Sequence, residues 1–213
     1  MIINLDKRVK VVLCIQKGWA RVRVYTESDH KKGGVTKKEA LALLREFSVP
    51  RHMIEHSRRV ADIACFLTSE LTKVGYMLDP SLVEAGSLLH DIAKAHSLKT
   101  GENHTSLGGK WLSERGLYKV ADIVLYHVDL PDEEMKISEV AVVNYSDKRV
   151  MDTKLVSLQE RFEGIVRRYG VDNRSMERIN FVFQKIKRLE QILFTPLPFG
   201  AEELIVRMKD DRL

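Results

Sequence analysis

His90 and Asp91, in the segment LLHDIAK, are the pair of neighbouring residues that says most about chemistry. Neighbouring residues on a helix project about 100° apart, so an imidazole and a carboxylate in this order can both reach one ion beside the helix. Lys94 follows Asp91 by three residues and projects over the same face, where its ammonium group can meet an anionic substrate. The segment therefore predicts two metal ligands and a cation near the end of one helix.

Other residues of metal-binding types lie on separate predicted helices. His56 precedes an apolar stripe, His104 begins a helix, and His127 ends another. Asp147 follows several apolar positions, where a carboxylate is costly to bury unless it is paired or metal-bound. The candidate metal ligands are thus His56, His90, Asp91, His104, His127 and Asp147. Four imidazoles and two carboxylates favour iron, manganese, zinc or a related transition metal over calcium.

Each candidate also has a simpler interpretation. His56, His90, Asp91 and Asp147 would then be satisfied polar groups in a helical core. For His104 and His127 the alternative is substrate contact or hydrogen bonding at a helix end. Lys148 and Arg149 lie beside Asp147, and we interpret them as part of a charged, solvated helix face rather than as phosphate ligands.

The order of these motifs resembles a known family. The series H…HD…D, read as His56, His90-Asp91 and Asp147 in the contexts HSRRVA, LLHDIAK and YSDKRV, is similar to the HD superfamily of metal-dependent phosphohydrolases. The resemblance covers about residues 45–165. His104 and His127 resemble the additional ligands of the subset that binds two metals. Within that subset, the layout looks most like HD modules associated with molybdenum-cofactor nucleotidyltransferases and HD hydrolases of symmetrical dinucleoside tetraphosphates.

The resemblance implies a specific role for each of the candidate residues. One divalent transition metal (Fe, Mn, Co, Ni or Zn) would be held by His56, His90 and Asp147. The second would be held by His104 and His127, with Asp91 bridging the two. Asp91 and Lys94 would be the catalytic residues, Lys94 through contact with phosphate. The implied reaction is hydrolysis of a nucleotide-like phosphate ester by a metal-activated water.

The sequence departs from relatives in a few places, and two other functions stay open. Ser146 precedes Asp147 where many relatives have a small apolar residue, and neither a GYP signature nor a nucleotidyltransferase glycine-rich loop is present. The same ligand set resembles that of di-iron oxygenases similar to myo-inositol oxygenase. A catalytically silent regulatory module is the third possibility, and the intact ligand candidates count against it.

Helices must position these residues, because apolar positions recur with helical spacing from residue 36 onward. Helices are predicted at about 36–47, 50–71, 81–95, 103–115, 117–128, 137–150, 156–169, 175–193 and 201–209. Two β-runs at 9–26 flank a turn at 16–19, and a linker follows at 27–34. The predicted fold class is all-α, an HD-domain helical bundle with a short N-terminal β-hairpin extension. The boundaries are 1–35 for the extension and linker, 36–170 for the metal-binding domain, and 171–213 for C-terminal helices packing on the core.

The amino-acid composition excludes several classes of protein. The 213 residues, 44% hydrophobic and 31% charged, can bury one core without disulfides and are not of a disordered type. No uncharged apolar run reaches the ~18 residues of a membrane span, and Cys14 and Cys65 cannot build a disulfide framework, which points to the cytoplasm. Much of the net charge of +5 falls in the first 38 residues, interpreted as a solvated basic extension. We expect a small phosphate ester as partner, and neither nucleic acid nor a membrane; no oligomeric state is predicted.

Overall fold

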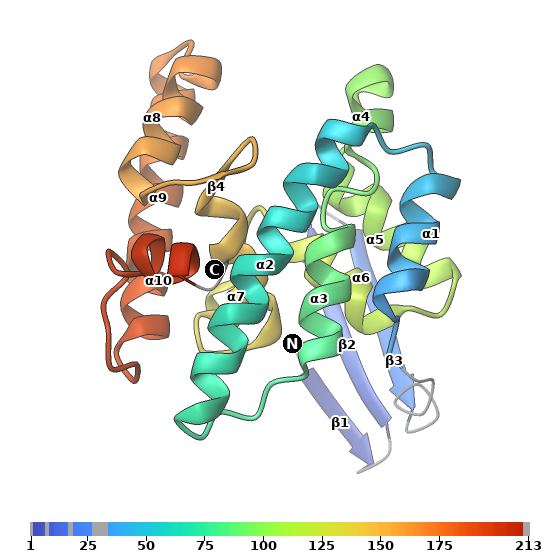
Figure 1. Cartoon of the computed structure of the whole chain (residues 1–213). Helices are drawn as coiled ribbons and strands as arrows, with labels where there is room; N and C mark the ends of the chain where they lie inside the picture. Colours follow the sequence, from blue (N-terminus) through green and yellow to red (C-terminus); the bar gives the residue numbers. More distant parts are fainter. Residues whose placement is uncertain (1, 7–8, 17–18, 27–33, 211–213) are drawn as a thin grey trace. The chain divides into compact units, whose positions relative to one another are not determined.

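The computed structural model describes residues 2–6, 9–16, 19–26 and 34–210 (Figure 1). The chain divides into two compact units, residues 1–34 and 35–213. The first is β-structure and the second is dominated by helices, so the predicted all-α class with a short N-terminal β-extension is confirmed.

The first unit is a three-stranded antiparallel sheet of β1 (Ile2–Asp6), β2 (Val9–Gln16) and β3 (Trp19–Thr26), in the order β1-β2-β3. Gln16 pairs with Trp19, so the register is that of a hairpin whose two connecting residues lie outside the described part of the chain. The predicted hairpin of β2 and β3 is thus part of a three-stranded sheet, and β1 was not predicted from the sequence. β1 is too short to show a pattern by itself, and its pairing with β2 defines it. The linker predicted at 27–34 lies outside the described residues except for Gly34.

The second unit is built from helices joined by short connections. They are α1 (Lys37–Glu46), α2 (Arg51–Lys73), α3 (Pro80–Leu89), α4 (Lys94–Thr100), α5 (His104–Glu114), α6 (Tyr118–Tyr126), α7 (Glu139–Lys148), α8 (Leu158–Tyr169), α9 (Asn173–Phe194) and α10 (Leu204–Asp210). A 3-10 turn, Asp132–Glu134, precedes α7, and the small hairpin of β4 (Val150–Met151) and β5 (Lys154–Leu155) follows it. The 3-10 turn and the hairpin were not predicted, because each is too short to show a pattern. None of the described helices is both long and apolar enough to cross a membrane.

Local sequence explains where the helices begin. The predicted capping box of α1 is present, since the Thr36 side chain accepts from the backbone of Glu39 and the Glu39 side chain accepts from the backbone of Thr36. Asp79 caps α3 through the backbone N–H groups of Ser81 and Leu82, and Pro80 occupies the first helical position. These caps define the start of α3, which packs against α2, and of α1, which packs against α3.

The helix expected at 81–95 is interrupted. α3 ends at Leu89, and a turn leads into the short α4. The turn is held by bonds from Ile92 N–H to Leu89 C=O and from Lys94 N–H to Asp91 C=O, both 3.0 Å long and both three residues apart. His90 and Asp91, which both lie in this turn, are buried.

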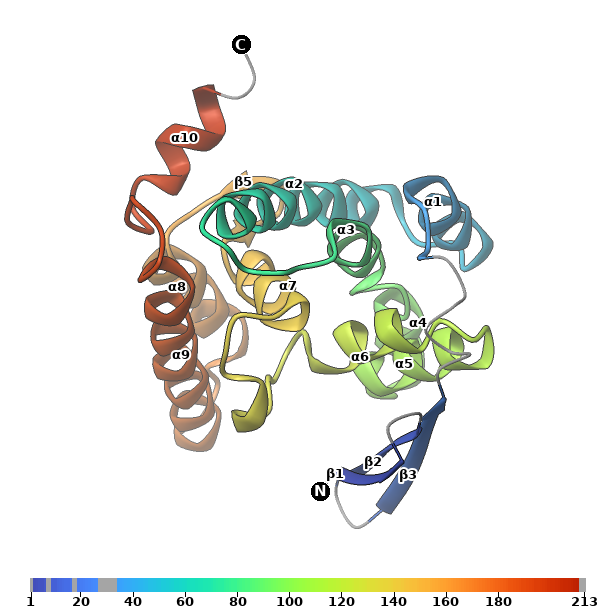
Figure 2. The same cartoon turned by 90° about the horizontal axis from the view of Figure 1, so that it is seen from below.

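Two apolar clusters fill the helical unit, and α2 contributes to both. One joins α2 to α7, α9 and the C-terminal residues, and the other joins α2 to α1, α3, α5 and α6. Figure 2 shows α7 lying between the α8–α9 pair on one side and α3 and α6 on the other. In α9, Ile186, Leu189 and Leu193 are buried against the first cluster. The C-terminal helices are therefore part of the core that supports α7.

Arg149 ties these C-terminal segments to the end of α7. It is fully buried, and its Nε donates to the carbonyl of Val156 at 2.7 Å. Its terminal nitrogens donate to Tyr145 Oη and to the carbonyl of Ala201, 3.2 and 3.3 Å away, and pair with Glu190 at 3.4 Å. The expectation of a solvated face for Arg149 is therefore wrong. One guanidinium holds four separate segments of chain.

Replacing Arg149 should destabilise the fold. Arg149→Met leaves buried carbonyl groups without donors and Glu190 without its cation, so the free energy of unfolding should fall by about 3 kcal/mol. Arg168→Met, an exposed change on α8, is the control and should stay within about 0.5 kcal/mol of wild type. Urea unfolding of the metal-free proteins measures both. Equal midpoints for the two variants would contradict the role given to Arg149.

Candidate metal centre

The structure brings all six candidate ligands into one cluster. His56 lies in the second turn of α2, His90 at the end of α3 and Asp91 in the turn that follows. The other candidates lie at helix ends: His104 begins α5, His127 follows α6, and Asp147 lies near the end of α7. Five segments of the chain therefore meet at this point.

Each imidazole presents its Nε2 atom to a carboxylate. His56 Nε2 lies 3.1 Å from Asp147 Oδ1, and His90 Nε2 lies 3.7 Å from the same oxygen and 3.4 Å from Asp91 Oδ2. Asp91 Oδ1 lies 3.4 Å from His127 Nε2 and 3.6 Å from His104 Nε2. The two oxygens of Asp91 thus face different histidines, as a carboxylate shared by two ions requires.

Backbone carbonyls fix the orientation and the tautomer of three of these rings. The Nδ1 atoms of His56, His90 and His127 lie 2.8, 2.7 and 2.7 Å from the carbonyls of Asp152, Ser87 and Val124. A carbonyl oxygen can only accept, so Nδ1 carries the hydrogen in each ring. The neutral ring then keeps its lone pair on Nε2, directed at a carboxylate. Metal-binding histidines are typically held in this way.

Several of the facing atoms are buried and lack a hydrogen-bond partner. They are His90 Nε2, Asp91 Oδ1 and His104 Nε2. Buried polar atoms are nearly always satisfied, so three unsatisfied atoms in one place need an explanation. Within the described residues, two groups have ligand atoms within 4.8 Å of one another: His56, His90 and Asp147, and His90, Asp91 and His127. His104 is in neither group, although its Nε2 faces Asp91. The donor set fits divalent metal ions of the transition series.

The electrostatics of the cluster favour the metal-binding protonation state of His104, His127 and Asp91, but not of His90. Burial lowers the pKa of His104 to about 4 and also lowers that of His127, so both rings are neutral near pH 7. Burial by itself would raise the pKa of Asp91, but the charges and hydrogen bonds of His90, His127 and Lys94 hold it well below its usual value. His90 has a raised pKa, because the two carboxylates outweigh the opposing effect of burial.

Comparison with known proteins agrees with this geometry. Residues 53–152 match the family model of the HD domain. This supports the HD superfamily, a superfamily of metal-dependent phosphohydrolases, and the match includes all six candidate ligands. Over 167 residues the chain is 26% identical to an uncharacterized protein of Methanocaldococcus jannaschii, an alignment that covers 71% of this chain and 97% of that protein. No solved structure matches the chain.

Lys148 and Asn144 support the candidate ligands from α7, and neither role was predicted. Lys148 is buried, and its Nζ donates to Asp147 Oδ2 at 2.8 Å and to the carbonyl of His127 at 2.9 Å. The Asn144 amide donates to the carbonyls of Tyr126 and His127, both at 2.9 Å. The solvated face expected for Lys148 is therefore wrong. The i, i+4 spacing of these two residues beside Asp147 is the only sequence signal for their role.

Asp152 holds His56 through its backbone rather than its side chain. It lies in the turn between β4 and β5 with φ of 56°, in the left-handed region that non-glycine residues seldom adopt. This conformation directs its carbonyl to His56 Nδ1. Because no sequence pattern surrounds this single turn residue, its role could not be predicted from the sequence.

Gly108 allows α5 to approach the turn that carries Asp91. A Cβ atom at this position would lie 2.8 Å from Val124 Cγ1 and 3.2 Å from Ile92 Cγ2. Val124 is the residue whose carbonyl holds His127, and Ile92 follows Asp91. The missing side chain therefore lets three ligand-bearing segments come together.

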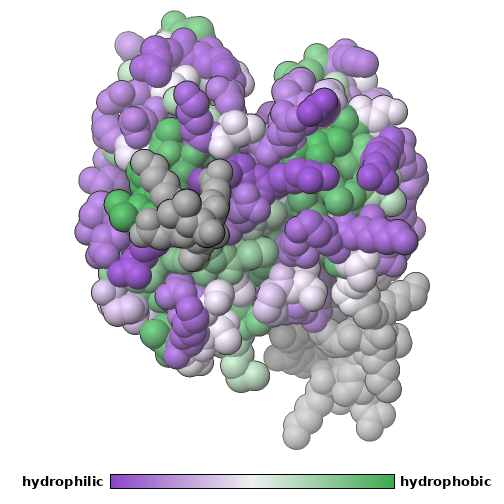
Figure 3. Space-filling view, in the orientation of Figure 1, coloured by the Kyte–Doolittle hydropathy of each residue, from purple (hydrophilic) through white to green (hydrophobic). Residues whose placement is uncertain are grey.

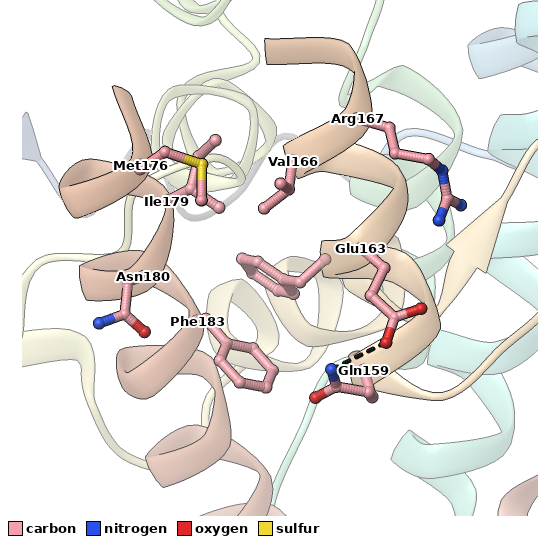
Figure 4. A pocket seen from close by; sticks show the side chains of 9 residues that line it. Gln159, Glu163, Val166, Arg167, Met176, Ile179, Asn180 and Phe183 are labelled. Carbon is pink, nitrogen blue, oxygen red and sulfur yellow. Dashed lines mark hydrogen bonds between the residues drawn. The ribbon is translucent and has the colours of Figure 1, made fainter. Parts of the chain in front are cut away.

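A cavity of ≈ 440 Å³ lies elsewhere, between α8 and α9 (Figure 4). Phe162, Val166, Ile179 and Phe183 give it an apolar lining, and Gln159 donates to Glu163 at its edge. It includes none of the six candidate ligands. The six candidate ligands therefore lie outside this cavity.

Replacing Lys148 tests how Asp147 is kept ionised. Lys148→Met removes the ammonium partner of a buried carboxylate, so the metal-free protein should lose about 3 kcal/mol of stability near pH 7. Burial by itself would raise the pKa of Asp147, but Lys148 and His56 hold this pKa well below 3.8. Its stabilising contribution is therefore present above that pH and is lost as the pH falls below it. Urea unfolding with a chelator present should show the difference between variant and wild type shrinking as the pH falls through 3.8.

Lys110→Met is the matched control, because Lys110 and Glu114 form an exposed pair 3.8 Å apart. It should change stability very little at any pH. A Lys148→Met protein as stable as wild type near pH 7 would show that Asp147 does not depend on Lys148.

Proposed function

We propose that this protein is a metal-dependent phosphohydrolase that uses two divalent ions. One observation carries the proposal: four imidazole Nε2 atoms face two buried carboxylates, and three atoms in that group have no hydrogen-bond partner. The HD domain match supports the same reaction class.

The residues divide into two sets around Asp91. His56, His90 and Asp147 would hold one ion, and His104 and His127 the other, with Asp91 shared through its two oxygens. Ions bound there would supply Lewis acidity toward a phosphoryl group and an activated water as nucleophile. The chain's own contribution is to keep His104 and His127 neutral and both carboxylates ionised. Carbonyls fix three of the imidazoles, and Lys94 and Lys148 each hold one carboxylate.

Lys94 extends this set toward the substrate. Its Nζ lies 2.6 Å from Asp91 Oδ2, and 38% of its side chain is exposed. A cation that touches the shared carboxylate and also meets solvent can contact phosphoryl oxygens as negative charge grows on them. Lys94 is thus the residue that we assign to charge stabilisation.

The proposed substrate is a nucleotide-like phosphate ester. Support comes from the sequence layout, which resembles HD hydrolases of dinucleoside tetraphosphates and HD modules associated with molybdenum-cofactor nucleotidyltransferases. An oxygenase of the HD superfamily would need the same ligands, so the two reactions must be separated by assay. The intact ligand set and its compensating charges argue against a catalytically silent module.

The number of ions can be counted. Metal-stripped protein reloaded with Mn²⁺ and desalted should hold two ions per chain, measured by elemental analysis. His104→Ala should hold about one, because the group of His56, His90 and Asp147 stays complete. His96→Asn changes an exposed imidazole outside the cluster and should hold as much as wild type. One ion in both wild type and His104→Ala would contradict the two-metal proposal.

Turnover tests the reaction class. The protein supplied with iron, manganese, cobalt or nickel should hydrolyse phosphomonoesters, nucleotides or dinucleoside polyphosphates. Asp91→Asn keeps the shape of the side chain but removes its charge, so kcat/KM should fall by about 100-fold or more. Phosphate release and oxygen uptake are followed in parallel. Oxygen uptake by the iron-loaded protein without phosphate release would replace the proposal by the oxygenase.

A further inference from the structure

Arg161, on α8, is a cation that neither the fold nor the ligand set explains. Its Nε atom is buried and has no hydrogen-bond partner. It forms no ion pair with a carboxylate in the described part of the chain, whereas Arg149 is fully satisfied. A buried guanidinium nitrogen without an acceptor is unfavourable unless something else binds it.

The face of α8 that carries Arg161 is turned away from the cavity of Figure 4. Gln159, Phe162, Glu163 and Val166 line that cavity, and at 100° per residue Arg161 lies on the opposite side of the helix. Gly164, one turn after Arg161, lies against β4, since a Cβ atom there would be 3.3 Å from Met151 Sδ. Arg161 therefore lies on the β4 side of α8.

That side of α8 is close to the metal ligands. Met151 precedes Asp152, whose carbonyl holds His56. The positive charge of Arg161 also lowers the pKa of Lys94, although the neighbouring carboxylates outweigh it. In Figure 1, α8 and α4 stand on either side of the half of α2 that carries His56, and Figure 3 shows a notch between them lined with hydrophilic residues. Arg161 and Lys94 are thus two cations approaching one site from different helices.

The two cations differ in what they already bind. Lys94 is paired with Asp91, and a phosphoryl group that reaches Lys94 also reaches the shared carboxylate. Arg161 has no acidic partner among the described residues. A guanidinium binds two oxygens of a phosphate at once, which an ammonium does not. Two cations that approach one site, one of them without an acidic partner, favour an anionic ligand with more than one charged group.

We propose that Arg161 binds a second phosphate of the substrate, linked to the phosphoryl group that is attacked. This inference rests on the proposed phosphohydrolase function and narrows its substrate class. The preferred substrates carry at least two linked phosphates, as in a nucleoside diphosphate or a longer polyphosphate chain. Simple phosphomonoesters bind less well, because they reach Lys94 and the metal ligands but leave Arg161 empty.

Ligand pairs that differ by one phosphate test the proposal. Metal-loaded wild type, Arg161→Met and Arg161→Lys are titrated by calorimetry with inorganic phosphate and with pyrophosphate, the metal being in excess. The kinetics of p-nitrophenyl phosphate and ADP are measured alongside. Arg167→Met is the control, since Arg167 is exposed on the same helix. Circular dichroism and metal content confirm that each variant is folded and loaded.

Wild type should bind pyrophosphate more tightly than phosphate. Arg161→Met should lose roughly 10- to 100-fold in affinity for pyrophosphate and in kcat/KM for ADP, the range expected for one charge-assisted contact. Its affinity for phosphate and its turnover of p-nitrophenyl phosphate should stay unchanged. Arg161→Lys should recover part of the loss, and Arg167→Met should behave as wild type.

The contrary outcomes separate this inference from the proposed function. Unchanged pyrophosphate binding by Arg161→Met would overturn the role of Arg161 and leave the phosphohydrolase intact. Equal losses for phosphate and pyrophosphate would place Arg161 on the attacked phosphoryl group and overturn the second-phosphate site. A metal-loaded wild type that binds neither anion and hydrolyses neither ester would overturn the proposed function, and this inference with it.

Discussion

Two carboxylates buried among imidazoles are the constraint on which the rest of the structure depends. Asp91 and Asp147 are nearly inaccessible to solvent, and an isolated ionised carboxylate would be very costly to bury. Each is therefore given one ammonium partner, Lys94 for Asp91 and Lys148 for Asp147. These lysines balance one oxygen of each carboxylate. The remaining oxygens face imidazole nitrogens, which gives an arrangement that could hold metal ions.

Helix ends and turns, rather than helix faces, provide the ligands. His90 and His127 both follow the last residue of a helix, and each ring bonds to the carbonyl three residues earlier. The end of a helix leaves carbonyl groups without an intrahelical partner, so the ring satisfies a group that would otherwise be unpaired. The same bond fixes the tautomer that directs Nε2 into the cluster. In His90 and His127, the hydrogen bond from the ring to the carbonyl therefore both ends the helix and orients the candidate ligand.

The residues that form the histidine and aspartate cluster could be predicted from the sequence, and those that hold them in place mostly could not. The spacing of His90, Asp91 and Lys94, together with the capping signals, is local information and predicted both the ligand types and the helices. The break after Leu89 was missed because the apolar and polar residues of this segment continue with helical spacing, and no glycine or proline marks the turn. Lys148 and Arg149 resemble a solvated helix face in the sequence. Only the packing of α9 and the turn after α6 shows that both are internal.

The C-terminal helices lie outside the segment that matches the HD domain model. The family match ends at residue 152, the residue whose carbonyl holds His56, so the ligand set and its immediate supports fall inside it. α8, α9 and α10 lie beyond that boundary, yet Arg149 binds the chain near both ends of this segment, at Val156 and Ala201. A segment anchored at both ends against α7 holds α8 at a fixed place beside the β4–β5 hairpin. Under the proposed second-phosphate site, residues of α8 that contact substrate can vary without disturbing the candidate ligands, because within the described part of the chain the hydrogen bonds and ion pairs of those ligands come from other segments.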